Sequence, residues 1–540
     1  MPEQSYGLSH SFRFGPPAPI DEAAAYFTAG DNARAEACCL AILQHDPQHF
    51  DALHMLGVLC FRRNALADAV SFLRRAERVS AAVAQLQANI GHAYMGLALH
   101  HEAELAFRRA LRLSQKPEAG LLNDLGTAQS GAGRHADSEA TFRAALALSP
   151  GFQPARFNLG SCLAAQGRHE EAACLFRLVL DGRVEDPERQ QAVASALALA
   201  YGALGRYEDA ASVCGELLTH QPRAAIGEWN ESLALLSLGR FREGLERYEA
   251  RWRVETHDKP HPRGSVLDLG TVAGRHVLVV AEQGRGDLLQ FARYAQMLAA
   301  RGARVTLQVY ADVAPVVRGM PGVRVITTED VEPEADSTTP LLSLPRAFGT
   351  TVATIPDRVP YLIVPPDRLE AWRVRLGPRQ GPRIGLAWRG LQHIPHRTMP
   401  VAALAPLLQL GGASFHALQK EIEPSDRDWL SRHGIEEHSG ALQDFGDTAA
   451  LISSMDVVIT IDTAVAHLAG GLAAPVWVML PFSADWRWLT GREDSPWYPT
   501  ARLFRQKIAG GWADVVEQVS AALVERFGSA TTAAEGRGGT

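Results

Sequence analysis

The second half of the chain holds two short runs whose residue types could do chemistry at the ends of strands. The first is Glu282-Gln283-Gly284-Arg285-Gly286-Asp287, which follows an apolar stretch at 276–281. The glycines Gly284 and Gly286 allow a tight turn and a close approach of the backbone to a ligand. The carboxylate of Asp287 could accept a proton from a hydroxyl group. The alternative is that Asp287 caps the helix that follows.

The second run is Asp462-Thr463-Ala464-Val465-Ala466-His467, which follows an apolar stretch at 457–461 and opens a helix of small residues. Free N–H groups and the helix dipole favour a phosphate at such a helix start. His467 lies one turn beyond Thr463 on the same helix face. Asp462, Thr463 and His467 are therefore predicted to bind a diphosphate or a sugar. The alternative is a helix cap followed by a core histidine.

Two further features could contribute to binding. Lys420 follows a predicted strand at 414–418, where it could neutralise phosphate or be an ordinary exposed lysine. Two loops carry aromatic clusters, Asp485-Trp486-Arg487-Trp488 and Ser495-Pro496-Trp497-Tyr498-Pro499. Tryptophans on loops can stack on sugars or bases, but a packed, rigid loop is the favoured interpretation.

Alternating strands and helices would position these residues. Short apolar stretches separated by helix-like sequence predict parallel sheets covered by helices, arranged as two lobes. An amphipathic helix is expected at 288–301, and another at 512–527. The predicted boundaries are a linker at 255–274, a first lobe at 275–365, a connector at 366–382, a second lobe at 383–527 and a disordered tail at 528–540. Further strands are expected at 305–309, 323–327, 383–388 and 476–480.

The first half of the chain is a repeat. Small residues recur in steps of 34, 34, 35, 34, 38 and 34 residues, and a turn residue follows each of them seven positions later. This spacing predicts about seven pairs of antiparallel helices, stacked into an all-α superhelix over 20–254 after a disordered segment at 1–19. The small residues are Ala23, Gly57, Gly91, Gly126, Gly160, Ala198 and Ser232, and the turn residues are Gly30, Asn64, Ala98, Gly133, Gly167, Gly205 and Gly239.

Polar side chains precede these small residues by two positions. Asn89, Asp124, Asn158 and Asn230 are expected to project along one side of the superhelical groove. An amide side chain can both donate to and accept from a peptide backbone, so such a row could hold an extended acceptor peptide. The alternative is that these residues cap or bridge neighbouring helices.

Composition limits the classes of function. The chain of 540 residues has a net charge of −7, with 46% hydrophobic and 21% charged residues, so it lacks the basic field of a nucleic-acid binder. Its six cysteines form no Cys-x-x-Cys pair. There is no apolar signal segment at the start and no run of 18 apolar residues, which predicts a cytoplasmic protein without a membrane span.

Residues 20–255 resemble the tetratricopeptide repeat family. Residues 275–527 look like the heptosyltransferase-related glycosyltransferases of family 9, and in particular like bacterial proteins in which such a domain follows tetratricopeptide repeats. The motifs that carry this resemblance are EQGRGDLLQFARY at 282–294, PLLSLP at 340–345, GLAWRG at 385–390, the run at 456–481, and DWRWL and DSPWYP after it.

The resemblance implies a GT-B fold of two Rossmann-like lobes, with the acceptor on the first and the nucleotide-sugar donor on the second. It implies that Asp287 is the general base, and that Asp462, Thr463 and His467 bind the donor together with Gly284, Gly286 and Lys420. It also implies no cofactor and no essential metal. Asp426-Arg427-Asp428 matches a metal-binding pattern but lies in a predicted helix.

Two departures from the family matter. Arg285 replaces an aliphatic residue between the glycines, and lipopolysaccharide heptosyltransferases lack the repeats. Heptose and lipid acceptors therefore do not carry over. We expect transfer of a sugar to a protein held in the groove, such as flagellin or another surface protein. The alternatives are an enzyme with a saccharide or lipid-linked acceptor, whose repeats only recruit partners, and a non-catalytic adaptor.

Overall fold

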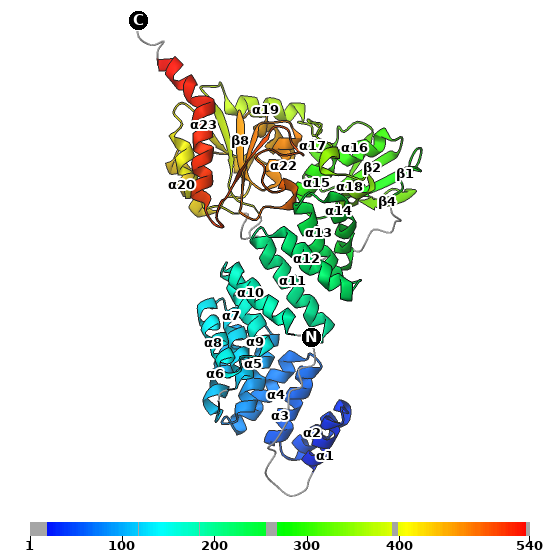
Figure 1. The fold of residues 1–540 in the computed structure, drawn as a ribbon, viewed down its shortest axis with the longest axis vertical. Coiled ribbons are helices and arrows are strands. Elements are labelled where there is room, and N and C mark those ends of the chain that lie inside the picture. Colours follow the sequence, from blue (N-terminus) through cyan, green and yellow to red (C-terminus); the bar gives the residue numbers. More distant parts are fainter. Residues whose placement is uncertain (1–18, 117, 183, 255–266, 391–397, 536–540) are drawn as a thin grey trace. The chain divides into compact units, whose positions relative to one another are not determined.

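A computed structural model describes residues 19–116, 118–182, 184–254, 267–390 and 398–535 (Figure 1). The chain divides into two compact units, Met1–Ala200 and Tyr201–Thr540, and each is described by itself. Nearly all of the segment predicted to be disordered at 1–19, most of the linker predicted at 255–274, and the end of the tail lie outside the described residues.

The first unit is built from consecutive antiparallel helices, and those between residues 19 and 181 each pack on the next. The predicted all-α region is thereby confirmed. Its helices are α1 (Pro19–Thr28), α2 (Asn32–His45), α3 (Phe50–Arg62), α4 (Leu66–Val79), α5 (Ala84–Gly96), α6 (His100–Leu113), α7 (Ala119–Gly131), α8 (His135–Leu148), α9 (Gln153–Ala165), α10 (His169–Asp181) and most of α11 (Pro187–Ala203).

The turn inside each helical pair has a left-handed backbone. All seven predicted turn residues have positive φ angles, between 57° and 80°. Five of the seven are glycine, which adopts this conformation without the steric cost of a Cβ atom. The predicted repeat register is therefore confirmed at the turn of every pair.

The small residues of the repeat let two helices of a pair approach closely. A Cβ atom on Gly126 of α7 would lie 2.6 Å from the ring of Phe142 on α8. Gly91 faces Phe107 at 2.6 Å and Gly160 faces Phe176 at 2.7 Å in the same way. The three phenylalanine side chains are almost fully buried. A glycine on the first helix and a phenylalanine on the second thus form the centre of three successive pairs.

The last helices of the repeat belong to the second unit. They are the end of α11, α12 (Tyr207–His220), α13 (Ala225–Ser237), α14 (Phe241–Tyr248) and the short η1 (Glu249–Arg253). Side chains of α13 and α14, among them Leu236 and Phe241, share one apolar cluster with the first sheet. The division between units therefore falls within α11, before the boundary at 254 that the repeat pattern suggests.

The remainder of the second unit contains two parallel sheets, as predicted. The first has the order β3-β2-β1-β4 and the second the order β10-β9-β8-β5-β6-β7 among the described residues. Their strands are β1 (His276–Val280), β2 (Arg304–Val309), β3 (Val323–Thr327), β4 (Ser337–Pro340), β5 (Arg383–Ala387), β6 (Ser414–Ala417), β7 (Glu436–Glu437), β8 (Val457–Ile461), β9 (Val476–Leu480) and β10 (Ala501–Arg505).

Helices cover both sheets. They are α15 (Arg285–Phe291), α16 (Arg293–Ala300), α17 (Ala314–Val317), α18 (Leu344–Ala347), α19 (Pro366–Leu376), α20 (Pro424–Arg432), α21 (Phe445–Ile452), α22 (Ala464–Gly471) and α23 (Trp512–Glu535). Short η helices lie at Leu341–Ser343, Val352–Thr354, Val401–Gln409, Ser439–Ala441 and Trp486–Trp488.

Three boundaries differ from the sequence prediction. The helix expected at 288–301 is broken into α15 and α16, because Nε of Arg293 donates a hydrogen bond to the carbonyl oxygen of Gln290 at 2.8 Å. The connector expected at 366–382 contains α19, which starts at a proline and ends before Gly377. The tail expected from 528 is helical as far as Glu535.

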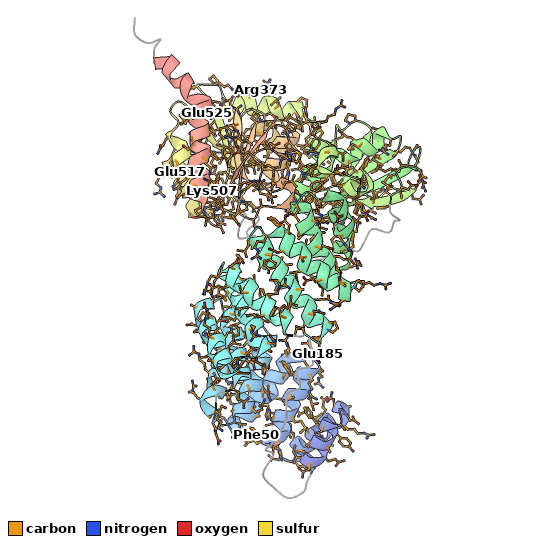
Figure 2. The ribbon with its side chains drawn as sticks, viewed as in Figure 1. Phe50, Glu185, Arg373, Lys507, Glu517 and Glu525 are labelled. Atoms are coloured by element: carbon orange, nitrogen blue, oxygen red, sulfur yellow. The ribbon has the colours of Figure 1, made fainter. Side chains whose placement is uncertain are left out.

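Helix α23 is amphipathic where its side chains are described. Val515, Val516 and Val519 are buried in the second core cluster, which covers one face of the second sheet. Glu517 and Glu525 are exposed on the other side of the helix (Figure 2). The helix therefore packs back on the second sheet, as its apolar spacing predicts.

Candidate functional site

Both sheets reverse their strand order next to a predicted motif. In the first sheet β2 and β3 lie on one side of β1 and β4 lies on the other, so the order reverses at β1. In the second sheet β6 and β7 lie on one side of β5, and β8 lies on the other. Parallel α/β sheets bind ligands at the carboxyl ends of strands at such switch points. The Gly284–Asp287 loop follows β1, and Asp462-Thr463 follows β8.

The two motifs meet although they follow different sheets. A Cβ atom on Gly286 would lie 3.0 Å from Cδ2 of His467 and 3.6 Å from Cα of Ala464. The start of α15 therefore packs directly on the start of α22, and a side chain at position 286 would crowd the ring of His467. Gly284, Asp287, Thr463 and Ala464 remain partly exposed around this contact.

Asp287 has a partner on each carboxylate oxygen. Its Oδ2 atom accepts a hydrogen bond from the N–H of Gly284 at 2.9 Å, so it caps α15. Its Oδ1 atom accepts from Nη2 of Arg487 in an ion pair. The capping alternative is thus present in the structure. The Asp287 side chain is still 19% exposed, so solvent reaches part of it.

Arg487 was not predicted as a site residue. Its side chain is only 8% exposed and also donates to Asp485 at 2.8 Å, with Trp486 and Phe291 stacked against its guanidinium. Burial disfavours the charge, but Asp485 and Asp287 together raise the pKa of Arg487 well above its ordinary value. The one signal in the sequence that could have indicated Arg487 is its place beside tryptophans in the DWRWL run. Its partner Asp287 is distant in the chain, so the ion pair itself could not be predicted.

Two of the three predicted residues of the second motif, Asp462 and His467, are buried. Thr463 caps α22 by accepting from the N–H of Val465 at 3.3 Å. His467 is 5% exposed, bonds to the hydroxyl of Tyr498 at 3.0 Å and stacks on Trp488. Asp462 is also buried and lies 3.9 Å from His467. The helix cap and core histidine named as the alternative are therefore observed, and Thr463 is the predicted residue of this motif that stays partly exposed.

The two aromatic loops are packed into the core, which agrees with the interpretation favoured from the sequence. Trp486, Trp488, Trp497 and Tyr498 are all buried in the same apolar cluster as the first sheet. Arg293 of α16 donates to the carbonyl oxygen of Trp497 at 2.9 Å and to the hydroxyl of Tyr361 at 2.7 Å. These contacts connect the loop that carries Trp497 to helix α16, which packs on the first sheet.

Lys420 lies in the loop after β6, which is separated from β8 by β5. It is exposed, and its Nζ atom donates to the carbonyl oxygen of Gln443 at 2.6 Å. No contact of Lys420 with Asp287 or Thr463 occurs among the described residues. The structure therefore does not bring this predicted phosphate ligand together with the two motifs.

The predicted groove residues of the first unit bridge neighbouring repeats. Asn89 donates to Nε2 of His54 at 2.8 Å, and Asn158 donates to Oδ1 of Asn123 at 2.8 Å. Asp124 pairs with His92 at 3.3 Å. Burial lowers the pKa of His92 and raises that of Asp124. The bridging alternative is thus observed, although all three predicted side chains stay partly exposed.

Asn230 differs from these three residues. It lies on α13 in the second unit and is 7% exposed. A peptide can reach little of its side chain. The predicted row of four is therefore reduced to Asn89, Asp124 and Asn158.

A buried ion pair that the sequence did not reveal joins the last repeat to the first sheet. Both Nε and Nη2 of Arg251 donate to the carboxylate of Glu282, at 2.8 and 2.9 Å. Glu282 also accepts from the N–H of Leu342, and Arg251 donates to Ser343. Burial disfavours the charge of Arg251, but Glu282 holds its pKa above the ordinary value. The loop that carries Asp287 is thereby anchored at its first residue.

Comparison with known proteins agrees with the helical geometry. The tetratricopeptide repeat family model matches residues 20–84, 89–151, 123–187 and 195–256. The N-terminal region consists of tetratricopeptide repeats. The match continues through α12–α14, so the repeats extend into the second unit.

One curated relative is Protein FlbA of Caulobacter vibrioides. It is 29% identical over 359 residues, a match that covers 59% of this chain. The chain spans 59% of the length of this relative.

Solved structures similar to this chain are repeat proteins. A thermophilic tetratricopeptide repeat protein of Thermus thermophilus has 20% identity and a TM-score of 0.28, covering 33% of this chain and 97% of its own. A tetratricopeptide repeat protein of Parabacteroides merdae has 16% identity and a TM-score of 0.37, covering 45% and 93%. YrrB, described as having an unusual peptide-binding site, has 21% identity and a TM-score of 0.29, covering 35% and 95%.

None of the described helices is both long enough and apolar enough to cross a membrane.

Proposed function

We propose that this chain is a metal-independent glycosyltransferase of the GT-B type, which moves a sugar from a nucleotide-sugar to a protein. One observation carries the proposal. Two parallel sheets reverse their order at β1 and at β5–β8, and the loops at these two switch points meet at Gly286 and His467. A two-substrate transfer needs binding positions on both sheets that face each other, and switch-point loops supply such positions.

In this reaction the hydroxyl oxygen of the acceptor attacks the anomeric carbon of the sugar. The bond from that carbon to the phosphate oxygen breaks, and the nucleoside diphosphate leaves with the bonding electrons. Asp287 takes the hydroxyl proton. A carboxylate has about four lone-pair positions, and the bonds to Gly284 and Arg487 use two of them. The start of α22 and Thr463 stabilise the leaving diphosphate.

The acceptor is held by the tetratricopeptide repeats. Asn89, Asp124 and Asn158 bridge helices yet remain partly exposed, so each amide or carboxylate can also contact a peptide backbone. Attachment of the repeats to the enzyme raises the local concentration of a weakly bound acceptor. Flagellin or another surface protein, modified in the cytoplasm before export, is the acceptor class we propose.

The test is intact-mass analysis of candidate acceptor proteins co-expressed with the full chain or with an Asp287→Asn variant. We expect a defined sugar mass on one acceptor, and a rate of transfer lower by about 10²–10⁴-fold in the variant, because the general base is lost. Binding of the donor should persist in the variant.

Asp485→Asn provides the matched control. Asp485 also pairs with Arg487 and is 18% exposed, so its loss disturbs the same guanidinium without removing the base. Asp485→Asn should therefore keep most of the transfer rate. Normal transfer by Asp287→Asn would exclude Asp287 as the base, and an equal loss in both variants would assign the effect to Arg487.

A non-catalytic adaptor is the second candidate. The burial of Asp462 and His467 and the ion pair at Asp287 favour it, since these contacts also suit a purely structural role. Calorimetric titration of the full chain with UDP, GDP and ADP separates the two candidates. Binding of one nucleotide in the micromolar to millimolar range supports the transferase, whereas no binding of any of them supports the adaptor.

A further inference from the structure

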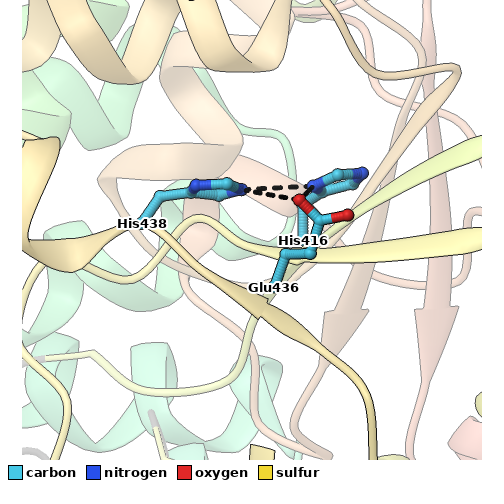
Figure 3. A group of neighbouring side chains, drawn as sticks. All are labelled: His416, Glu436 and His438. Atoms are coloured by element: carbon cyan, nitrogen blue, oxygen red, sulfur yellow. Dashed lines mark hydrogen bonds and ion pairs between the residues drawn. The ribbon is translucent and has the colours of Figure 1, made fainter. Parts of the chain in front are cut away.

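Three metal-ligating side chains converge at the edge of the second sheet, outside the proposed transfer site. They are His416 on β6, Glu436 on β7 and His438 directly after β7 (Figure 3). His416 and Glu436 are register partners in the parallel pair of strands. Glu436 and His438 are two residues apart, so they lie on the same face of the strand. The topology of the sheet edge thus places all three side chains together.

The distances between their ligand atoms suit a single tetrahedral ion. Nδ1 of His416 lies 3.2 Å from Nε2 of His438 and 3.5 Å from Oε2 of Glu436. Nε2 of His438 lies 3.9 Å from the same oxygen. Zinc–ligand bonds of about 2.0–2.1 Å at tetrahedral angles separate neighbouring ligand atoms by about 3.3 Å. The observed triangle therefore needs only a small adjustment around an ion.

The surroundings prepare both imidazoles for this role. His416 and His438 are 1% and 6% exposed. Nε2 of His416 bonds to the hydroxyl of Ser414 at 2.9 Å, and Trp372 packs edge-on against His438. Such outer contacts orient metal-binding histidines in proteins.

We infer that His416, Glu436 and His438 form a binding site for a divalent transition metal, with Zn²⁺ as the ion that fits best. Two imidazole nitrogens and one carboxylate oxygen are ligands that Zn²⁺ accepts, whereas Mg²⁺ and Ca²⁺ prefer sites made of oxygen alone. Three protein ligands leave the fourth tetrahedral position to water. Glu436 is 54% exposed, so solvent reaches this side of the site.

The ion would stabilise the edge of the sheet. Strand β7 is two residues long and forms its ladder with β6. The loops beyond the ligands meet where Lys420 donates to the carbonyl oxygen of Gln443. A metal at the base of both loops would fix β7 and the Lys420–Gln443 contact. It is separate from Asp287 and Thr463, so the proposed transfer chemistry remains independent of metal.

The experiment uses the full chain without an affinity tag, stripped with a chelator and then titrated with Zn²⁺ and with Co²⁺. We expect one Zn²⁺ per chain, a rise in Tm of about 5 °C at saturation, and the visible absorption bands of tetrahedral Co²⁺. Glu436→Gln and His438→Ala should raise the Kd for Zn²⁺ by about 100-fold or more, since loss of even an outer contact costs about 10–100-fold.

His433→Ala is the matched control. His433 is an exposed histidine of the same lobe, stacked on Trp429 and outside the cluster, and its loss should leave the affinity unchanged. Glu436→Gln keeps the shape of an exposed side chain and should fold, which circular dichroism checks. The inference is overturned if the intact chain binds no Zn²⁺, or if Glu436→Gln and His438→Ala bind it as tightly as the original chain does.

Discussion

Single residues determine how closely α15 and α22 pack at their contact. A Cβ atom on Gly286 would lie 3.0 Å from the ring of His467, which contacts Tyr498 and Trp488. From the sequence one can predict that a glycine loop and a helix start each follow a strand. Their mutual contact, and the capture of Asp287 by Arg487, depend on how the two sheets pack and have no local signal.

Gly286→Ala should therefore weaken both folding and transfer. The new methyl group would lie 3.0 Å from Cδ2 of the buried His467 ring, so the ring or the loop must shift by a few tenths of an ångström. We expect the free energy of unfolding to fall by about 1–3 kcal/mol, and the proposed transfer rate to fall with it because the loop is displaced. Urea unfolding and mass analysis of the acceptor measure the two effects. Gly202→Ala, at an open position of α11, should change neither.

Three successive helical pairs share one packing arrangement, in which a phenylalanine of the second helix packs against a glycine of the first. The spacing of small residues was sufficient to predict these pairs and their turns. Apolar runs also predicted β3, β8 and β9 to the residue. The strands β4, β7 and β10 were missed because β4 is polar and ends in proline, β7 has two residues, and β10 alternates with arginine.

Two glycines of α7 test whether this close packing of phenylalanine against glycine stabilises the repeat. A Cβ atom on Gly126 would lie 2.6 Å from the Phe142 ring, whereas at Gly120 nothing lies within 4 Å. Gly126→Ala should lower the free energy of unfolding by about 1–3 kcal/mol. Gly120→Ala should leave it unchanged or raise it by less than about 1 kcal/mol. Equal effects of both changes on urea unfolding would exclude close packing as the reason for the glycine.

On the scale of the whole molecule, the last repeats belong to the same compact unit as the α/β half. The last repeats share an apolar cluster with the first sheet. Arg251 and Glu282 pair across this junction with almost no exposure. The sequence predicted both halves with a linker between them, but it did not predict this ion pair, because a contact between distant segments leaves no periodic signal.

Arg251→Met should cost about 3–5 kcal/mol of unfolding free energy, because the Glu282 carboxylate would stay buried without its partner. A second ion pair across the same junction, between Arg346 and Glu246, is exposed at Glu246. Glu246→Gln should cost less than about 1 kcal/mol. Chemical unfolding of the two variants compares a buried and an exposed pair at one junction, and similar costs would contradict the burial argument.

The pairing of Arg251 with Glu282 also limits how genes of this kind can recombine. A crossover between the last repeat and the first strand would join a foreign repeat end to a loop that carries a buried carboxylate, and the hybrid would be unstable unless the new end supplied an arginine at the same place. A crossover inside α11, where the compact units divide, exchanges repeats and leaves this pair intact. We therefore expect that exchange of the repeats before α11 keeps this ion pair, whereas the last repeats have to stay together with the α/β half.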